Sequence, residues 1–428
     1  MAGAVKAVVT GAGAICATGT DPDAIWDAVD EGRSGIAPIT QWDASAWPAG
    51  IAGEITDVSP RTLVPDRKLH KFIRRTDMFG LFAASSAIDA SGFATYRDQL
   101  DENSAATFSD RSGVFVGSGG GAYQTQYDYF PLFDEARGSL EAFGRELETN
   151  VSPMWLLRTL PNNVLCHVGI RYGLKGTNAC ITSHSAGSLL AVVEALEALR
   201  GDEADRAVVV AHDALVEPQS VLYYARAGLL ARDGLRPFDA RRDGSVFGEG
   251  AAAIVIETEP SARERAAPIL GEVLGGAETS DGLGVLEIGE DGDGLASAIV
   301  LAIDDAGIDA DEVGMIVAHG NGTRRSDRTE AAAIRSVFGA GAPPVTSFKW
   351  SFGHLIAASG MIDVVLALAC LRRGVVPGIA TLETPDPEFE DLPLAHEARD
   401  PRSDVALVLN RGFAGTNSAV LVRAARQR

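Results

Sequence analysis

The chain has few cysteines, and none of them is paired at metal-ligand spacing. Four cysteines (Cys16, Cys166, Cys180 and Cys370) are scattered over 428 residues, without CxxC or CxxH spacing. Neither a disulfide framework nor a zinc site is indicated, and no metal is expected. This cysteine usage fits a reducing compartment, so we expect a cytoplasmic protein.

Long apolar runs and a basic excess are also missing. No stretch approaches the roughly 18 apolar residues of a membrane span, and the N-terminal MAGAVKAVVTGAGAICATG is interrupted by four glycines, unlike a signal peptide. The net charge is −21, with 58 acidic against 37 basic residues. This balance argues against nucleic acid or an anionic membrane surface as partner, and its even spread is typical of a solubilising surface.

What the chain does contain is a series of short apolar runs rich in β-branched residues. They are KAVVTGAG near residue 6, SGVFVGSG near 112, NACITS near 178, RAVVVAH near 206, GMIVAHG near 314 and VALVLNRGFAG near 405. Buried strands that alternate with helices predict a layered α/β sandwich. Two helices are clear, one after Asp21 and one from Gly294, because a glycine closes each.

Three longer features bear on the organisation of the chain. RAVVVAH and MIVAHG both follow apolar helices and end at a histidine, which suggests a rough internal duplication. Residues 100–160 are richer in polar and aromatic residues, and we expect an insertion that caps the core and lines a cavity or a dimer contact. The polar stretch 276–294 is expected to be a surface loop.

The early GAGAIC segment invites comparison with a dinucleotide-binding turn. Cys16 stands where the third glycine of GxGxxG belongs, and no acidic residue closes a following strand about 20 residues on. We therefore expect no nucleotide cofactor.

Two candidate nucleophiles, Cys180 and Ser185, lie in TNACITSHSAGSLL. The residues from Ala186 onward form an apolar helix that is predicted to be buried. Ser185 thus lies at a strand-to-helix turn, where backbone N–H groups and the helix dipole favour developing negative charge. Cys180 falls inside the strand, where a cysteine is usually an inert apolar residue. An ordinary N-cap serine is the alternative interpretation of Ser185.

Two histidines occupy similar turns farther along. His319 follows a buried strand and precedes Gly-Asn-Gly-Thr, and Asp327 and Glu330 open the next helix. Lys349 lies five residues before His354 at another glycine-rich turn. A lone histidine at such a turn is more often structural, but two histidines, a lysine and a helix-terminal serine together favour a nucleophile-plus-base site.

The chain resembles the β-ketoacyl-ACP synthases of the type II, elongating kind along essentially its whole length. The matching motifs include VVTGAGAICATG, LPNNVLCHVGIRYGLKG, GDEADRAVVVAHDAL, LRPFDARRDGSVFGEGAAAIVIE, AHGNGT, KWSFGH and GFAGTN. The resemblance implies the thiolase-like fold, a duplicated αβαβα sandwich. Its N-terminal half, residues 1–258, would carry the nucleophile, and its C-terminal half, 259–428, the paired histidines.

In that family the nucleophile is a cysteine nine residues after the glycine of LKG and twenty residues before the last aspartate of a GDAD-like stretch. Gly176 plus nine and Asp205 minus twenty both give Ser185. The resemblance therefore assigns the nucleophile position to Ser185. It also implies that His319 and His354 polarise the malonyl thioester carbonyl and assist decarboxylation or proton transfer.

Other positions carry family roles by the same transfer. Lys349 with Glu330 would form a buried ion pair that supports the histidines. Thr323 would hydrogen-bond the phosphopantetheine arm, so the implied partner is an acyl carrier protein and no other cofactor is expected. Phe413, beside Gly412, would be the gating aromatic residue, with its backbone N–H joining that of the nucleophile in an oxyanion hole. A homodimer, or a heterodimer with a ketosynthase partner, is expected.

Five positions depart from the family pattern. Ser185 replaces the cysteine, His184 a small residue, Asn321 the first threonine of HGTxT, Ser245 the phenylalanine of RDGF, and Arg411 an aromatic residue beside the gate. We expect Asn321, Arg411 and His184 to border the substrate or the pantetheine arm. Arg411 would contact a polar or anionic acyl substituent or, alternatively, be a surface-facing salt-bridge residue.

A serine nucleophile changes the chemistry. A cysteine thiol is partly ionised at neutral pH, whereas a serine hydroxyl needs a base within hydrogen-bond reach. His354 is the first choice for this base and His319 the second. His184 is expected to be a pocket wall, because adjacent side chains rarely face one another. Since an oxoester is a poorer acyl donor than a thioester, ordinary fatty-acid elongation is disfavoured.

The sequence therefore predicts an acyltransferase of a specialised polyketide pathway, such as antibiotic biosynthesis. It would accept an acyl chain on Ser185 and use the histidines for condensation or for intramolecular aldol or lactone cyclisation. The competing hypothesis is a non-catalytic, chain-length-factor-like subunit of a ketosynthase heterodimer. The retained His319, His354 and Lys349 favour the enzyme, because a purely structural subunit has no need of them.

Overall fold

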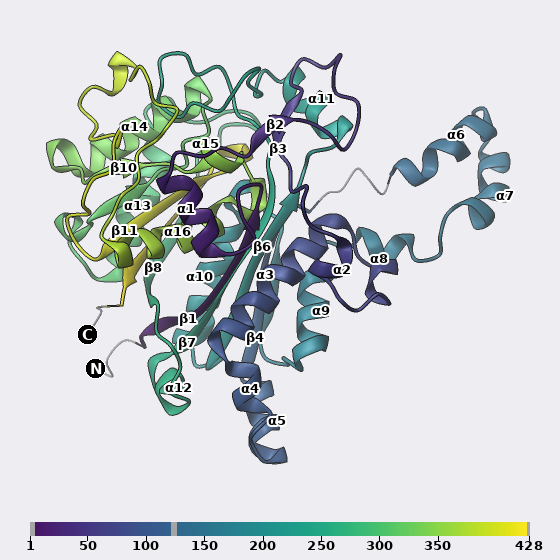
Figure 1. Cartoon of the computed structure of the whole chain (residues 1–428), viewed down its shortest axis with the longest axis horizontal. Helices are drawn as coiled ribbons and strands as arrows, with labels where there is room; N and C mark the ends of the chain where they lie inside the picture. The colour runs from purple at the N-terminus through teal and green to yellow at the C-terminus, as the bar shows by residue number, and fades with distance from the viewer. Residues whose placement is uncertain (1–4, 121–125, 426–428) are drawn as a thin grey trace.

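A computed structural model describes residues 5–120 and 126–425, and one mixed sheet of ten strands runs through it (Figure 1). The strands are β1 (Ala7–Cys16), β4 (Ser112–Ser118), β5 (Asn178–Ile181), β6 (Arg206–Ala214), β7 (Glu249–Thr258), β8 (Gly271–Ser280), β9 (Met315–Val317), β10 (Val345–Thr346), β11 (Val405–Arg411) and β12 (Thr416–Ala424). A separate antiparallel pair joins β2 (Ile36–Pro38) to β3 (Ile51–Gly53). All six strands predicted from apolar runs form, as do the two predicted helices.

The strand order repeats, which confirms an internal duplication. One half of the sheet runs β5-β4-β6-β7-β1 and the other β10-β9-β11-β12-β8. In each half the first three strands are parallel, and the fourth and fifth strands each pair antiparallel with the strand before them. The halves join where β1 pairs with β8, at Val9 and Gly271. The predicted equivalence of RAVVVAH and MIVAHG is wrong in detail. RAVVVAH forms β6, the third strand of its half and the counterpart of β11, whereas MIVAHG forms β9, the second strand of its half and the counterpart of β4.

Helices cover both outer faces and fill the space between the halves, which gives the predicted αβαβα layering. On the first half, α3 (Arg75–Ser91) packs on β1, β6 and β7, beside α9 (Asn163–Tyr172). On the second, α13 (Asp293–Ala306) packs on β8 and β12, beside α14 (Arg324–Phe338). Helices α10 (Gly187–Arg200) and α16 (Ser359–Arg373) lie in the middle and contact strands of both halves. Both are apolar around most of their circumference because they are covered on all sides.

Local signals explain where the helices begin and end. The Asp21 side chain accepts a hydrogen bond from the Ala24 N–H at 2.9 Å and so caps α1 (Pro22–Asp30). Gly307 ends α13 with a φ of +63°. The other short helices of the body are α2 (Pro60–Leu63), α4 (Phe93–Arg97), α5 (Glu102–Asp110), α11 (Pro218–Arg226), α12 (Glu259–Glu264) and α15 (Lys349–Phe352). Within the described ranges, none of the helices has the length and apolar character needed to cross a bilayer.

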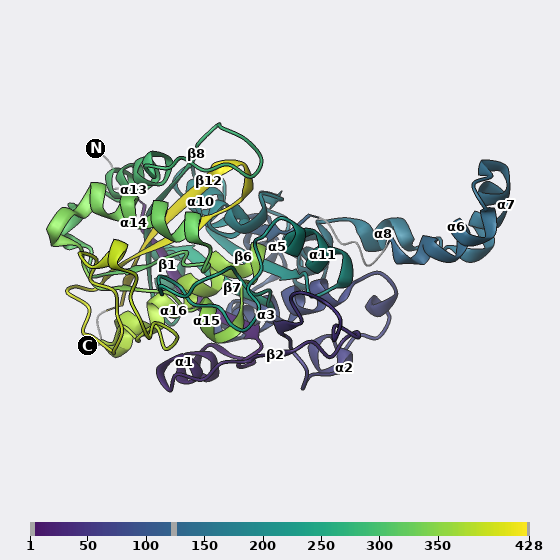
Figure 2. The same cartoon turned by 90° about the horizontal axis from the view of Figure 1, so that it is seen from above.

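The expected insertion is partly a helical arm. Residues 102–118 form α5 and strand β4, which lies between β5 and β6 in the sheet, so they belong to the body. Helices α6 (Phe130–Ala136), α7 (Leu140–Asn150) and α8 (Trp155–Thr159) project away from it (Figure 2). None of the described arm residues, 126–160, lines the cavity described below, whereas Asn103, Thr107 and Phe108 of the expected insertion line a separate pocket. A dimer contact stays a prediction.

The expected surface loop begins later than predicted. Residues 276–280 continue β8, where they pair with β12, and the connection to α13 occupies only residues 281–292. This loop carries Val285 and Leu286, which line the cavity described below. The segment therefore contributes to the site as well as to the surface.

Candidate active site

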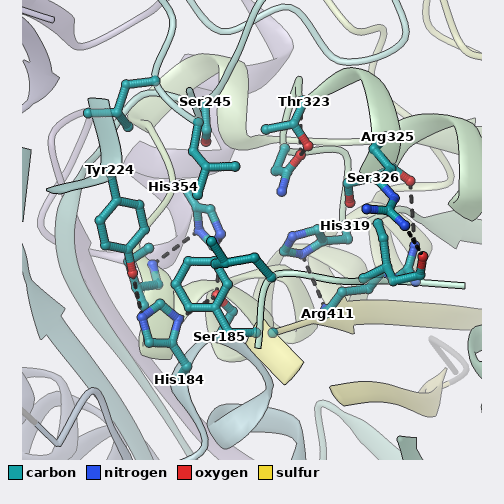
Figure 3. Close-up of a pocket in the computed structure, with 18 of the residues that line it drawn as sticks. His184, Ser185, Tyr224, Ser245, His319, Thr323, Arg325, Ser326, His354 and Arg411 are labelled. Atoms are coloured by element: carbon teal, nitrogen blue, oxygen red, sulfur yellow. Dashed lines mark hydrogen bonds between the residues drawn. The ribbon is translucent and has the colours of Figure 1, made fainter. Parts of the chain in front are cut away.

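A cavity of about 420 Å³ lies where turns from both halves of the sheet meet (Figure 3). Ser185 comes from the turn between β5 and α10, His319 follows β9, and His354 follows α15. Seven other residues singled out from the sequence also line it: His184, Ser245, Asn321, Thr323, Arg411, Gly412 and Phe413. Side chains far apart in the sequence therefore share one chamber.

Ser185 is only 3% exposed and lies in a short turn, His184–Ala186, directly before α10. The residue at the N-cap of α10 is Ala186, so the interpretation of Ser185 as an ordinary N-cap is wrong. The Ser185 Oγ atom lies 3.4 Å from His354 Nε2 and 3.4 Å from His184 Nδ1. Its hydroxyl therefore faces two imidazole rings at the positive end of a helix.

His319 and His354 form a pair whose ring centroids are 5.1 Å apart. The backbone N–H of Arg411 is directed at His319 Nδ1, with the nitrogens 3.4 Å apart. The backbone N–H of Ile356 likewise donates to His354 Nδ1 at 3.1 Å. At His354 Nδ1 is the acceptor, so the proton of that neutral ring lies on Nε2. The Arg411 N–H also donates to Asn410 Oδ1, at the shorter distance of 2.9 Å.

Both rings are neutral. Burial, reinforced by the charge of Lys349, lowers the pKa of His319 and of His354 well below the ordinary value. Two neutral imidazole rings thus border the cavity. Such a pair can stabilise negative charge that develops on a carbonyl oxygen.

Lys349 forms a buried ion pair, but with Asp363 rather than with Glu330. Its Nζ lies 3.0 Å from Asp363 Oδ2, and both side chains are fully buried. The Glu330 carboxylate instead accepts hydrogen bonds from the backbone N–H groups of His319 and Gly320, at 2.7 and 2.9 Å. The expected Lys349–Glu330 pair is therefore wrong, because spacing along the chain did not identify the carboxylate that reaches the lysine. Glu330 fixes the turn that carries His319.

Two residues of α16 that the sequence analysis missed support the histidines. Ser359 Oγ is 2.8 Å from His354 Nδ1, and Asp363 holds Lys349. Burial raises the pKa of Asp363, and the lysine opposes that shift. The sequence did contain a signal for a buried role of Asp363. It is the single acidic residue in the apolar run SGMIDVVLALAC, one helical turn after Ser359.

The turn after His319 depends on its glycines. Gly320 and Gly322 have φ values of +42° and +77°, and a Cβ on Gly320 would lie 2.5 Å from a serine oxygen. Within the turn, Asn321 Oδ1 accepts both the N–H and the hydroxyl of Thr323, at 3.0 and 2.8 Å. This leaves the Thr323 oxygen as a hydrogen-bond acceptor at the cavity wall.

Phe413 packs against the ring of His184 at a centroid distance of 4.7 Å. The adjacent Ala414 has a φ of +59°, and its N–H donates to the loop that follows β8. The backbone of Gly412 lies close to the nucleophile turn, since a Cβ there would be 3.7 Å from the backbone nitrogen of Ser185. The gate and oxyanion-hole roles of this segment stay predictions.

Arg411 is buried, which rules out a surface-facing salt bridge. Its Nε donates to Asn417 Oδ1 at 2.9 Å and its Nη1 to Thr329 Oγ1 at 2.5 Å. The carboxylate of Asp281 lies 3.7 Å from Nη2. Through Arg411, β11 therefore contacts Asp281, the first residue of the 281–292 loop. Contact with an acyl substituent stays a prediction.

His184 is more than a pocket wall. Its φ of +51° places it in the left-handed region and directs its Nδ1 to 3.4 Å from Ser185 Oγ. Its Nε2 lies 2.5 Å from the hydroxyl of Tyr224, a residue without a recognisable motif in the sequence. The expectation that adjacent side chains do not face one another is wrong here, because it assumes ordinary backbone angles.

The remaining candidates from the sequence are Cys180, Ser245 and a metal site. Cys180 is not among the described residues that line the cavity, and burial raises the pKa of its thiol to about 11. The Ser245 hydroxyl is buried in the cavity wall without a hydrogen-bond partner among the described residues. Across the ranges 5–120 and 126–425, no group of three or more histidine, cysteine or acidic side chains could hold a metal ion.

Comparison with known proteins extends this description. Residues 5–262 match the family described as Beta-ketoacyl synthase, N-terminal domain, and residues 270–383 match Beta-ketoacyl synthase, C-terminal domain. The chain is 31% identical over 428 residues to the 3-oxoacyl-[acyl-carrier-protein] synthase 2 of Coxiella burnetii, with coverage of 97% of this chain and 98% of that protein.

Two solved structures share the whole fold. The ishigamide ketosynthase/chain length factor matches with a TM-score of 0.86 at 27% identity, over 99% of this chain and 100% of that chain. A chain from the complex of a type II PKS acyl-carrier protein with its ketosynthase bound to the hexaketide matches with a TM-score of 0.83 at 25% identity, with the same coverage of both chains. Sequence and fold agree along the whole length, and the chain therefore belongs to the β-ketoacyl synthase family of acyltransferases.

Proposed function

We propose that the chain is a ketosynthase-like acyltransferase of a specialised polyketide pathway. It accepts an acyl chain from an acyl carrier protein onto Ser185 and then forms a carbon–carbon bond. The observation that carries the proposal is the position of Ser185 Oγ, 3.4 Å from His354 Nε2 at the start of α10, in a cavity that His319 also lines. The likeness to a type II PKS ketosynthase in complex with its carrier protein supports the choice of partner.

The proposed first step is acyl transfer. Ser185 Oγ bonds to the thioester carbonyl carbon, the carbon–sulfur bond breaks, and the hydroxyl proton ends on the departing pantetheine thiol. Backbone N–H groups of Ser185 and Phe413, beside Gly412, would hold the oxyanion. Thr323, whose own hydroxyl proton is donated to Asn321, would accept a hydrogen bond from an amide of the arm.

The proposed second step uses the neutral histidine pair. An enolate, formed by loss of CO₂ from a malonyl-type unit, attacks the oxoester carbonyl, and the Ser185 oxygen leaves and takes up one proton from solvent. His319 and His354 would donate their Nε2–H groups to the enolate oxygen. In the intramolecular variant the attacking group is an enolate or a hydroxyl of the bound chain itself.

A second candidate function is a chain-length-factor-like subunit that pairs with an active ketosynthase. The likeness to the ishigamide ketosynthase/chain length factor favours this alternative. The two candidates differ in what the lone chain does. An enzyme self-associates as a homodimer and becomes acylated, whereas an accessory subunit requires its partner and stays unmodified.

Intact-protein mass spectrometry tests the proposal. The native chain, Ser185→Ala and Cys180→Ala are incubated with an acyl carrier protein loaded with a short acyl chain. We expect an acyl adduct on the native chain and on Cys180→Ala, but not on Ser185→Ala. If none of the proteins carries an adduct, the accessory role is favoured, and if Cys180→Ala alone loses it, the assignment of Ser185 is wrong.

A further inference from the structure

The tautomer of His354 prevents it from acting as the base for Ser185. Its Nδ1 accepts the backbone N–H of Ile356 at 3.1 Å, and the Ser359 hydroxyl, 2.8 Å from the same atom, can also donate to it. The proton of the neutral ring therefore lies on Nε2. Nε2 is the atom 3.4 Å from Ser185 Oγ. An N–H group at that position donates to the serine oxygen and cannot take its proton.

The other ring within reach is His184, which also lies 3.4 Å from Ser185 Oγ, through Nδ1. Its Nε2 contacts the Tyr224 hydroxyl at 2.5 Å. If Tyr224 donated to Nε2, the His184 proton would sit on Nδ1, and Ser185 Oγ would face two N–H donors. If Tyr224 accepts from Nε2–H, the Nδ1 lone pair is directed at the serine, and the Ser185 proton has an acceptor.

The second arrangement forms a continuous row of hydrogen bonds (Figure 3). His354 donates to Ser185, Ser185 donates to His184, and His184 donates to Tyr224. Phe413 holds the two aromatic partners in place, at centroid distances of 4.7 Å from His184 and 5.4 Å from Tyr224. Burial lowers the pKa of His184 to about 4, so its ring is neutral and able to accept at neutral pH.

We propose that His184 is the base that takes the Ser185 proton and that Tyr224 is the positioning residue that keeps the Nδ1 lone pair of His184 directed at the serine. This inference rests on the proposed function, in which Ser185 is acylated. As the bond from Ser185 Oγ to the thioester carbon forms, the hydroxyl proton moves to His184 Nδ1. As the carbon–sulfur bond breaks, His184 returns that proton to the pantetheine thiolate, so the ring ends in its starting state.

The test compares acylation rates in serine and cysteine backgrounds. Acyl-pantetheine thioester is the probe, and the time course of adduct formation is followed by intact-protein mass spectrometry at pH 7. His184→Asn should slow acylation of Ser185 by about 10²- to 10⁴-fold, the usual contribution of a general base. In a Ser185→Cys background the same change should alter the rate by less than about tenfold, because a thiol ionises without a base.

Tyr224→Phe tests positioning separately. It should slow Ser185 acylation, have little effect in the Ser185→Cys background, and add nothing to His184→Asn, because it acts through that ring. A merely structural defect would slow both backgrounds equally. His167→Asn, which alters a histidine of α9 outside the cavity lining, is the matched control and should acylate at the native rate.

The outcomes separate this inference from the proposed function. If the native chain forms a Ser185 adduct and His184→Asn forms it equally fast, the inference is wrong and the function stands. If His184→Asn does not fold by circular dichroism, His184→Gln replaces it, and native-rate acylation of that variant overturns the inference in the same way. If the native chain forms no adduct at all, both fail together.

Discussion

The buried Lys349–Asp363 pair allows a quantitative test of how the site is supported. Asp363→Asn keeps the side-chain volume but leaves the Lys349 ammonium without its counter-ion, where both side chains are fully buried. At 3.0 Å and an effective dielectric constant of about 20, two unit charges attract by about 5.5 kcal/mol. Burial offsets part of this attraction, since it raises the pKa of Asp363 despite the lysine. We expect Asp363→Asn to lower the free energy of unfolding by about 3–5 kcal/mol.

Urea-induced unfolding, followed by circular dichroism, measures this loss in a double-mutant cycle of Asp363→Asn, Lys349→Met and the combined variant. The combined variant buries no charge at this site and should lose clearly less than the sum of the two single variants. Arg145→Met is the control, because both side chains of its ion pair with Glu141 are exposed and the pair should be worth less than about 1 kcal/mol. The reasoning is refuted if Asp363→Asn costs no more than this control, or if the two single losses add.

Two further predictions concern the histidine pair. After burial, the Lys349 charge is the next cause of the low pKa of His319 and His354, so Lys349→Met should raise both pKa values. Because the pair works in its neutral form, the acid limb of the condensation rate should move to higher pH; an unmoved limb in a pH–rate profile would contradict this. Gly320→Ala forces a Cβ to within 2.5 Å of Ser347 Oγ at a φ of +42°, so it should cost at least about 1 kcal/mol in urea unfolding. It should also lower product formation, and native values for both would show that this turn tolerates a side chain.

The sequence identified strands where apolar β-branched residues run together, but not where glycine interrupts them. β8, GEVLGGAETS, contains glycines that are typical of a loop, and its last residues were predicted to be one. Gly275 is required for a different reason, because a Cβ there would lie 2.6 Å from the backbone nitrogen of Ala306 in α13. The close approach of a helix is a tertiary contact, so local pattern alone does not distinguish it from a turn.

The residues of the site also fall into those that the sequence predicts and those that depend on tertiary contacts. Ser185, His319 and His354 could be predicted because each stands at a strand or helix end in a motif with regular spacing. The partner of Lys349 could not be predicted, because two buried carboxylates were available and only the packing of α16 brings Asp363 within 3.0 Å. The orientation of His184 depends on one left-handed backbone angle, which neither composition nor periodicity predicts for a histidine.

The hydrogen-bonding contact between Ser185 and His354 joins residues 169 positions apart, one from each half of the duplicated sheet. Because each residue is carried by a different half, the reacting groups meet only when both halves have folded and docked. An intermediate with one half folded would keep much of its secondary structure and have no assembled site. During refolding, recovery of acylation should therefore lag behind recovery of helical circular dichroism, which makes the chemistry a reporter of the docking of the two halves.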